Sequence, residues 1–146
     1  MEVVISKDQL EKLIRLVYLG NWVVNSFRAD ERIEEYDRVA EHILALAPSK
    51  GLKDLVEFDE FEGRYFPSGK LEKDSEDFLL EYEDNVFWNM LVDALAERDL
   101  VRTYGRDAVD AMEWNEYNEK MEPLQKKYEK EIDEFGLDRL DVLKVS

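Results

Sequence analysis

The chain has 146 residues, of which 45% are apolar and 12% aromatic, and this length and composition suit one domain with a packed core. It contains no cysteine and a single histidine, His42, which excludes disulfides, thiolate metal sites, cysteine nucleophiles and sites built on several histidines. Its 36 acidic residues against 20 basic ones give a net charge of −16, so we expect no direct binding to nucleic acids or to anionic membrane surfaces.

The first helix is predicted to begin after Ser6. Ser6 and Gln9 have the spacing of a capping box, and Ile5 and Leu10 flank it as an apolar pair. Because Gly20 lies on the apolar stripe of this helix, we interpret it as a point at which another helix approaches closely. The stripe recurs at steps of three and four residues: Leu10, Leu13, Val17, Gly20, Val24 and Phe27.

A second helix is predicted from about Asp30 to Ala47, where Pro48 ends it. The short joint between the two helices favours an antiparallel pair. Residues 48–74 have no helical period and contain two prolines and three glycines, which indicates a long crossover loop. A partial alternation of apolar and polar residues around Gly63 fits a small β-hairpin equally well.

The third helix is predicted from a cap at Asp74 or Ser75 to about Asp99. Only two of residues 86–96 are polar, so we expect this helix to lie at the centre of the bundle. Residues 100–104 are predicted to form an extended connector.

A final helical region is predicted after a cap at Asp107. Apolar and aromatic residues recur at helical spacing from Trp114 to Phe135, and the phase continues through Pro123. Because proline removes one backbone hydrogen bond, we expect one long helix with a kink near Glu119, and two helices that share a face are the alternative.

Together these elements predict a mainly α fold. It is an irregular antiparallel bundle of about four helices, with a long crossover loop and at most a small β-hairpin. The bundle is expected to form a single domain over residues 1–146.

The negative charge is concentrated in the middle of the chain. Residues 75–100 contain eight acids and one base, whereas residues 1–29 have a net charge of +1. The longest uncharged stretch, from Leu16 to Phe27, has 12 residues, fewer than the roughly 20 that a bilayer span needs. Residues 1–8 also lack a signal core, so we expect a cytoplasmic protein.

A polar residue recurs at every fourth position of the third helix: Glu81, Asn85, Asn89, Asp93 and Glu97. Tyr18 and Trp22 lie off the main stripe of the first helix, and aromatic side chains of this kind commonly anchor interfaces. We therefore predict a protein-binding surface formed by Tyr18, Trp22, Glu81, Asp84, Asp93 and Glu97. The alternatives are that the polar stripe is a solvated helix edge and that Trp22 is buried within the chain.

Two acidic pairs favour a different site. Glu31-x-x-Glu34 and Glu81-x-x-Asp84 resemble the motifs of all-α nucleotide pyrophosphohydrolases, which carry Glu-x-x-Glu on one helix and Glu-x-x-Asp on the next. The resemblance implies a magnesium or manganese site held by these four carboxylates and a hydrolase of phosphorylated small molecules.

Two other features indicate no site. The segment from Gly63 to Lys70 has five residues between its glycines, and Leu71 stands where a phosphate-binding loop needs serine or threonine. His42 has no local nucleophile to activate, so we interpret it as a partly buried histidine with one hydrogen bond.

Because no catalytic motif is evident, we expect a non-catalytic interaction protein of the inhibitor or immunity type, without a cofactor. Its partner is expected to be a protein with a basic surface, since a strongly negative field speeds that encounter. A DNA mimic and the magnesium-dependent hydrolase are the alternatives, and homo-oligomerisation stays open.

Overall fold

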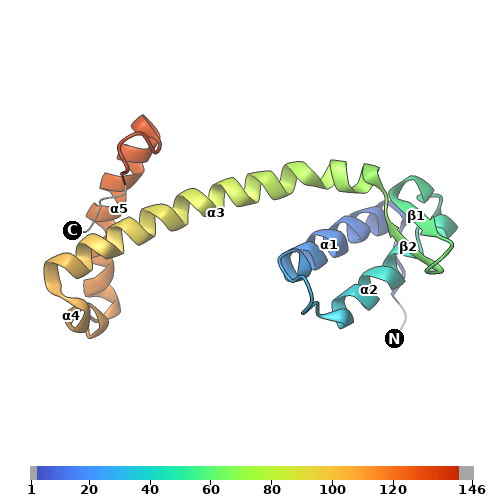
Figure 1. The fold of residues 1–146 in the computed structure, drawn as a ribbon, viewed down its shortest axis with the longest axis horizontal. Coiled ribbons are helices and arrows are strands. Elements are labelled where there is room, and N and C mark those ends of the chain that lie inside the picture. Colours follow the sequence, from blue (N-terminus) through green and yellow to red (C-terminus); the bar gives the residue numbers. More distant parts are fainter. Residues whose placement is uncertain (1–2, 142–146) are drawn as a thin grey trace. The chain divides into compact units, whose positions relative to one another are not determined.

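The structure, a computed structural model, describes residues 3–141 and is mainly helical (Figure 1). A two-stranded hairpin accompanies the helices, so the predictions of a mainly α fold and of a small hairpin are confirmed. The elements in chain order are α1 (Lys7–Asn25), α2 (Glu34–Leu44), the 3-10 helices Pro48–Lys50 and Lys53–Leu55, β1 (Val56–Asp59), β2 (Arg64–Pro67), α3 (Gly69–Tyr104), α4 (Arg106–Asp110) and α5 (Trp114–Phe135).

The chain divides into two compact units, Met1–Tyr82 and Glu83–Ser146. Each unit has its own apolar core, and α3 contributes its first turns to one unit and its last turns to the other. The two units are therefore described separately, and the single-domain organisation stays a prediction.

The N-terminal unit packs α1 beside α2, with α2 against β2. The capping box forms as predicted, because the Ser6 side chain accepts a hydrogen bond from Gln9 N and the Gln9 side chain accepts one from Ser6 N. The buried core residues come from both helices, the segment that follows α2, β1 and the start of α3: Leu10, Ile14, Leu44, Ala47, Leu52, Leu55, Val56 and Leu71.

The predicted stripe of α1 is only partly correct. Leu10 is buried, but Phe27 lies beyond the end of the helix and is 73% exposed. Gly20 is also exposed, and a Cβ atom built on it meets no atom within 4 Å. The close approach predicted at Gly20 is therefore wrong for the described part of the chain.

Replacing Gly20 with alanine is expected to raise the free energy of unfolding by about 0.5–1 kcal/mol, because alanine loses less backbone entropy in a helix. A thermal melt would show this as an increase in Tm of about 2 °C. The control is Gly63→Ala, which should lower Tm, because Gly63 has φ +67° and alanine is strained in that conformation. A fall in Tm for Gly20→Ala would show that another helix does pack on this position.

α2 is shorter than predicted at both ends. It begins at Glu34 because the preceding residue, Ile33, donates its backbone N–H to the Asn25 side chain instead of entering the helix. His42 is exposed on the side of α2 opposite Ala40, so its predicted partial burial is wrong.

The hairpin forms around the residues that its alternation indicates. β1 and β2 pair antiparallel, with Val56 opposite Pro67 and Asp59 opposite Arg64. The Asp59 carboxylate accepts hydrogen bonds from two backbone N–H groups of the turn, and Gly63 supplies the positive φ that the turn needs.

α3 begins earlier and ends later than predicted. Ser68 precedes the helix, and its hydroxyl accepts a hydrogen bond from Leu71 N while donating one to Asp54 O. Ser75 is no cap, because it is buried inside the helix and donates its hydroxyl to Leu71 O.

The predicted extended connector at residues 100–104 is wrong, because these residues continue α3. Leu100 is fully buried on the same helical face as Val92 and Ala96, so the packing of the C-terminal unit holds this turn helical. The expectation that residues 86–96 lie at the centre of a bundle is also wrong, since Phe87 and Met90 are exposed.

The C-terminal unit packs the last turns of α3 against α4 and α5. α4 follows Gly105, whose φ is +85°, and Asp107 lies inside this short helix and is not its cap. α5 is a single helix that passes through Pro123, so the two-helix alternative is excluded. Among residues 3–141, no helix combines the length and apolarity that a membrane crossing requires.

Candidate functional site

The two aromatic residues predicted on α1 lie in the N-terminal unit and are half-buried. Tyr18 packs against the apolar core of this unit. Burial, followed by the negative charges of Glu72 and Glu76, raises the pKa of its phenol above the ordinary value. Tyr18 therefore serves the packing of α1 near the start of α3.

The four predicted carboxylates of α3 are divided between the units, with Glu81 in the N-terminal one. In the C-terminal unit, Asp93 Oδ1 accepts a hydrogen bond from Gln125 Nε2 at 2.8 Å, and Glu97 forms an ion pair with Arg106 at 2.8 Å. These two carboxylates therefore hold neighbouring helices, which makes them poorer candidates for a partner. Within the described residues, Asp84 forms no hydrogen bond with another helix; its carboxylate accepts a hydrogen bond from Trp88 on the same helix.

The acids of the magnesium hypothesis do not gather into a ligand set. Within residues 3–141 no group of three or more acidic or histidine side chains is placed to hold a metal ion. Glu34 lies 3.5 Å from Arg38 in an ion pair, and Asp84 accepts a hydrogen bond from Trp88. The geometry supplies no support for the hydrolase alternative.

A groove in the C-terminal unit runs between α3 and α5, with a volume of about 480 Å³. Its floor is apolar, because Val92 is buried there and Ile132 packs against the same core. The residues that line it are Trp88, Asn89, Val92, Glu129, Ile132 and Asp133.

The indole ring of Trp88 has two contacts on α3. Its Nε1 donates a hydrogen bond of 3.0 Å to Asp84 Oδ1. Phe87 contacts it edge to face, with ring centroids 4.9 Å apart at 74°. These contacts fix the orientation of the ring that forms one wall of the groove.

Two carboxylates on the α5 side of the groove form no ion pair with the described residues. Glu129 and Asp133 are exposed, one helical turn apart on α5, and neither forms a hydrogen bond or ion pair with the described residues. The pKa of Lys126 is raised mainly by Glu122, whose carboxylate binds the Lys126 ammonium at 2.5 Å. The charge of Glu129 makes a smaller contribution to the same rise. The groove therefore has two carboxylates that are not occupied by an ion pair or hydrogen bond within the described residues.

Further apolar side chains are exposed on α3, on a face of the helix that is turned away from the groove residue Val92. Phe87 is 51% exposed and Met90 is 66% exposed, although both are types that prefer burial. Glu83 and Asp84 precede them on the same helix. We call the set formed by Glu83, Asp84, Phe87, Trp88, Met90, Glu129 and Asp133 the Trp88 surface.

A second polar cluster fastens α5 to α3 beside the groove. Asp99 on α3 accepts hydrogen bonds from the Tyr128 hydroxyl, from Arg98 and from Lys127. These contacts, with the Tyr128 hydroxyl the strongest, lower the pKa of Asp99 to about 2. Because Tyr128 directly precedes Glu129, this cluster ties α5 to α3 next to the groove.

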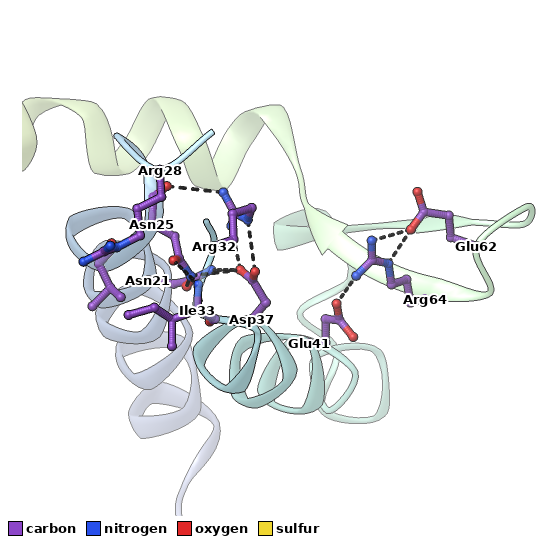
Figure 2. A network of polar contacts seen from close by, with 10 residues as sticks. Asn21, Asn25, Arg28, Arg32, Ile33, Asp37, Glu41, Glu62 and Arg64 are labelled. Carbon is purple, nitrogen blue, oxygen red and sulfur yellow. Dashed lines mark hydrogen bonds and ion pairs between the residues drawn. The ribbon is translucent and has the colours of Figure 1, made fainter. Parts of the chain in front are cut away.

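The N-terminal unit contains a buried polar network that connects α1 to α2 (Figure 2). Asn25 is 1% exposed, and its amide bonds the Asn21 side chain and both backbone groups of Ile33. Arg32 binds Asp37 through two nitrogens, which lowers the pKa of that carboxyl. Every polar group here has a partner within the chain, which assigns the network to structure.

Most of the Trp88 surface is not evident from the sequence. The sequence predicts a site at Asp84 and places Asn89 on the polar stripe of α3, but the predicted surface includes none of Trp88, Glu129 and Asp133. The spacing of four residues between Glu129 and Asp133 is a usable signal, because it places both on one face of a helix. Only the packing of α5 on α3 shows that this face meets Trp88. No family model, no curated protein and no solved structure matches this chain.

Proposed function

We propose that this chain is a non-catalytic interaction protein that binds the basic surface of a protein partner through the Trp88 surface. The observation that carries the proposal is the exposure of Phe87 and Met90 on the same helical face as Glu83, an exposed acid that forms no ion pair with the described residues. Aromatic residues and methionine are enriched in the cores of protein interfaces, and charged residues surround them.

The charge of the C-terminal unit supports a basic partner. Its 17 acids and nine bases give a net charge of −8, half of the charge of the chain. Such a field accelerates encounter with a positively charged surface and is weakened by salt, whereas the apolar contacts supply affinity after encounter. An inhibitor- or immunity-type role in the cytoplasm is the specific form that we propose.

The apolar part of this surface is tested by the double variant Phe87→Ala/Met90→Ala. Tagged wild-type and variant chains would be used to co-purify proteins from source-cell extract at low and high salt. A basic protein retained by the wild type at low salt would then be purified and its Kd measured. We expect the variant to bind at least about tenfold more weakly, as for the loss of interface anchors.

The matched control is Tyr36→Ala/Val39→Ala on α2, since these residues are also exposed, by 53% and 58%. This control is expected to bind like the wild type. Recovery of no basic partner, or equal weakening by both double variants, would contradict the proposal.

A further inference from the structure

The groove between α3 and α5 has the chemistry of a receptor for a cationic side chain. We propose that it receives one arginine side chain of the partner, an inference that rests on the proposed function. The guanidinium would lie on the Trp88 ring and between the carboxylates of Glu129 and Asp133, and its aliphatic stem would contact the apolar floor.

The wall and floor of the groove match the two ends of such a side chain. A guanidinium is attracted to the face of an aromatic ring, and tryptophan is the strongest of these acceptors. Val92 and Ile132 offer an apolar surface to the methylene groups, which long cationic side chains bury while their charged ends stay near water.

The charges in the groove select a cation. Glu129 and Asp133 face no basic side chain across the groove, because the other residues that line it are Trp88, Asn89, Val92 and Ile132. Among the neighbouring bases of α5, Lys126 is bound to Glu122 and Lys127 to Asp99, whereas Lys130 forms no ion pair with the described residues. An arriving cation would therefore compensate two carboxylates without displacing an existing ion pair.

Arginine fits this groove better than lysine for a geometric reason. Its planar group can stack on an indole and donate hydrogen bonds to carboxylates at the same time, whereas an ammonium is a compact and strongly hydrated point charge. The fixed orientation of the Trp88 ring, held by Asp84 and Phe87, prepares the stacking surface before binding.

The test uses the tripeptide acetyl-Gly-Arg-Gly-amide, so it requires no partner protein. Citrulline in place of arginine is the matched probe, because it has nearly the same shape and no charge. Binding is followed by the NMR shift of the Trp88 indole N–H, assigned from its loss in Trp88→Phe. We expect the arginine peptide to shift this signal with saturation, the lysine peptide to bind more weakly, and the citrulline peptide to bind at least about tenfold more weakly.

Two charge variants complete the test. Glu129→Gln/Asp133→Asn should weaken arginine-peptide binding at least about tenfold, whereas Glu57→Gln/Glu60→Gln, which removes two exposed acids of the hairpin region, should leave it unchanged. The circular dichroism spectrum verifies that both variants fold.

Absence of a saturable shift, or equal binding of the citrulline peptide, would overturn the assignment of the groove. Equal weakening by both charge variants would overturn it as well, because binding would then follow net charge alone. Failure of the proposed function gives a different result: no partner is recovered by co-purification, while the tripeptide still binds the groove.

Discussion

Replacing Asn25 with alanine is expected to lower the free energy of unfolding by about 3 kcal/mol. The Asn25 side chain is almost completely buried. It is bonded to both the N–H and the carbonyl of Ile33 and belongs to the network drawn in Figure 2. Alanine would leave these backbone groups buried without partners and would also leave a small cavity. Urea unfolding measures the loss, and amide hydrogen exchange should show that it is greatest in α1 and α2.

The control for this prediction is Asn118→Ala. Asn118 is exposed on α5 and forms no hydrogen bond with the described residues, so its replacement should change the free energy of unfolding by less than about 0.5 kcal/mol. A loss below about 1 kcal/mol for Asn25→Ala would mean that water satisfies the abandoned groups, contrary to the structural role assigned to this network.

Replacing Asp99 with asparagine is expected to lower the free energy of unfolding at pH 7 by about 1–2 kcal/mol. Its carboxylate accepts hydrogen bonds from Tyr128, Arg98 and Lys127, and its side chain is 20% exposed. The expected loss is smaller than a full conversion of the pKa shift, because the cationic partners are largely exposed and are screened by solvent.

The same cluster predicts a pH dependence with a defined sign. The pKa of Asp99 is about 2 in the folded chain, below the ordinary aspartate value of 3.8, so its contribution is fully present above pH 3.8. It is lost as the pH falls through the folded pKa. The difference in stability between wild type and Asp99→Asn should therefore be constant near neutral pH and should shrink between about pH 4 and pH 2.

Urea unfolding at a series of pH values measures this difference. Glu119→Gln is the control, since Glu119 is exposed on α5 and forms no ion pair with the described residues. A difference that grows as the pH falls would contradict the assigned role of Asp99.

The parts of the fold that the sequence predicts correctly depend on neighbours along the chain. Ser6 and Gln9 lie three residues apart, so their capping box is visible in the sequence. The alternation around Gly63 predicts the hairpin, and the period through Pro123 predicts a continuous α5. The net charge of −16 likewise follows from composition.

The errors arise where distant residues compete with local preferences. Ser75 resembles a cap, but it is drawn into α3 because Ser68 caps the chain earlier, beside Asp54. Residues 100–104 resemble a connector, but the burial of Leu100 extends the helix. Gly20 resembles a packing site, yet the described chain brings nothing near it.

The amino-acid sequence by itself determines that this protein is acidic, helical and without cysteine chemistry. Net charge, helical period and residue content do not depend on contacts between residues that are distant in the chain. Only the tertiary structure decides that Glu129 and Asp133 face Trp88, and that Asp93 and Glu97 are occupied by contacts within their unit. The physical reason is that helical periodicity specifies which face of a helix is apolar, whereas side-chain packing selects which two faces meet.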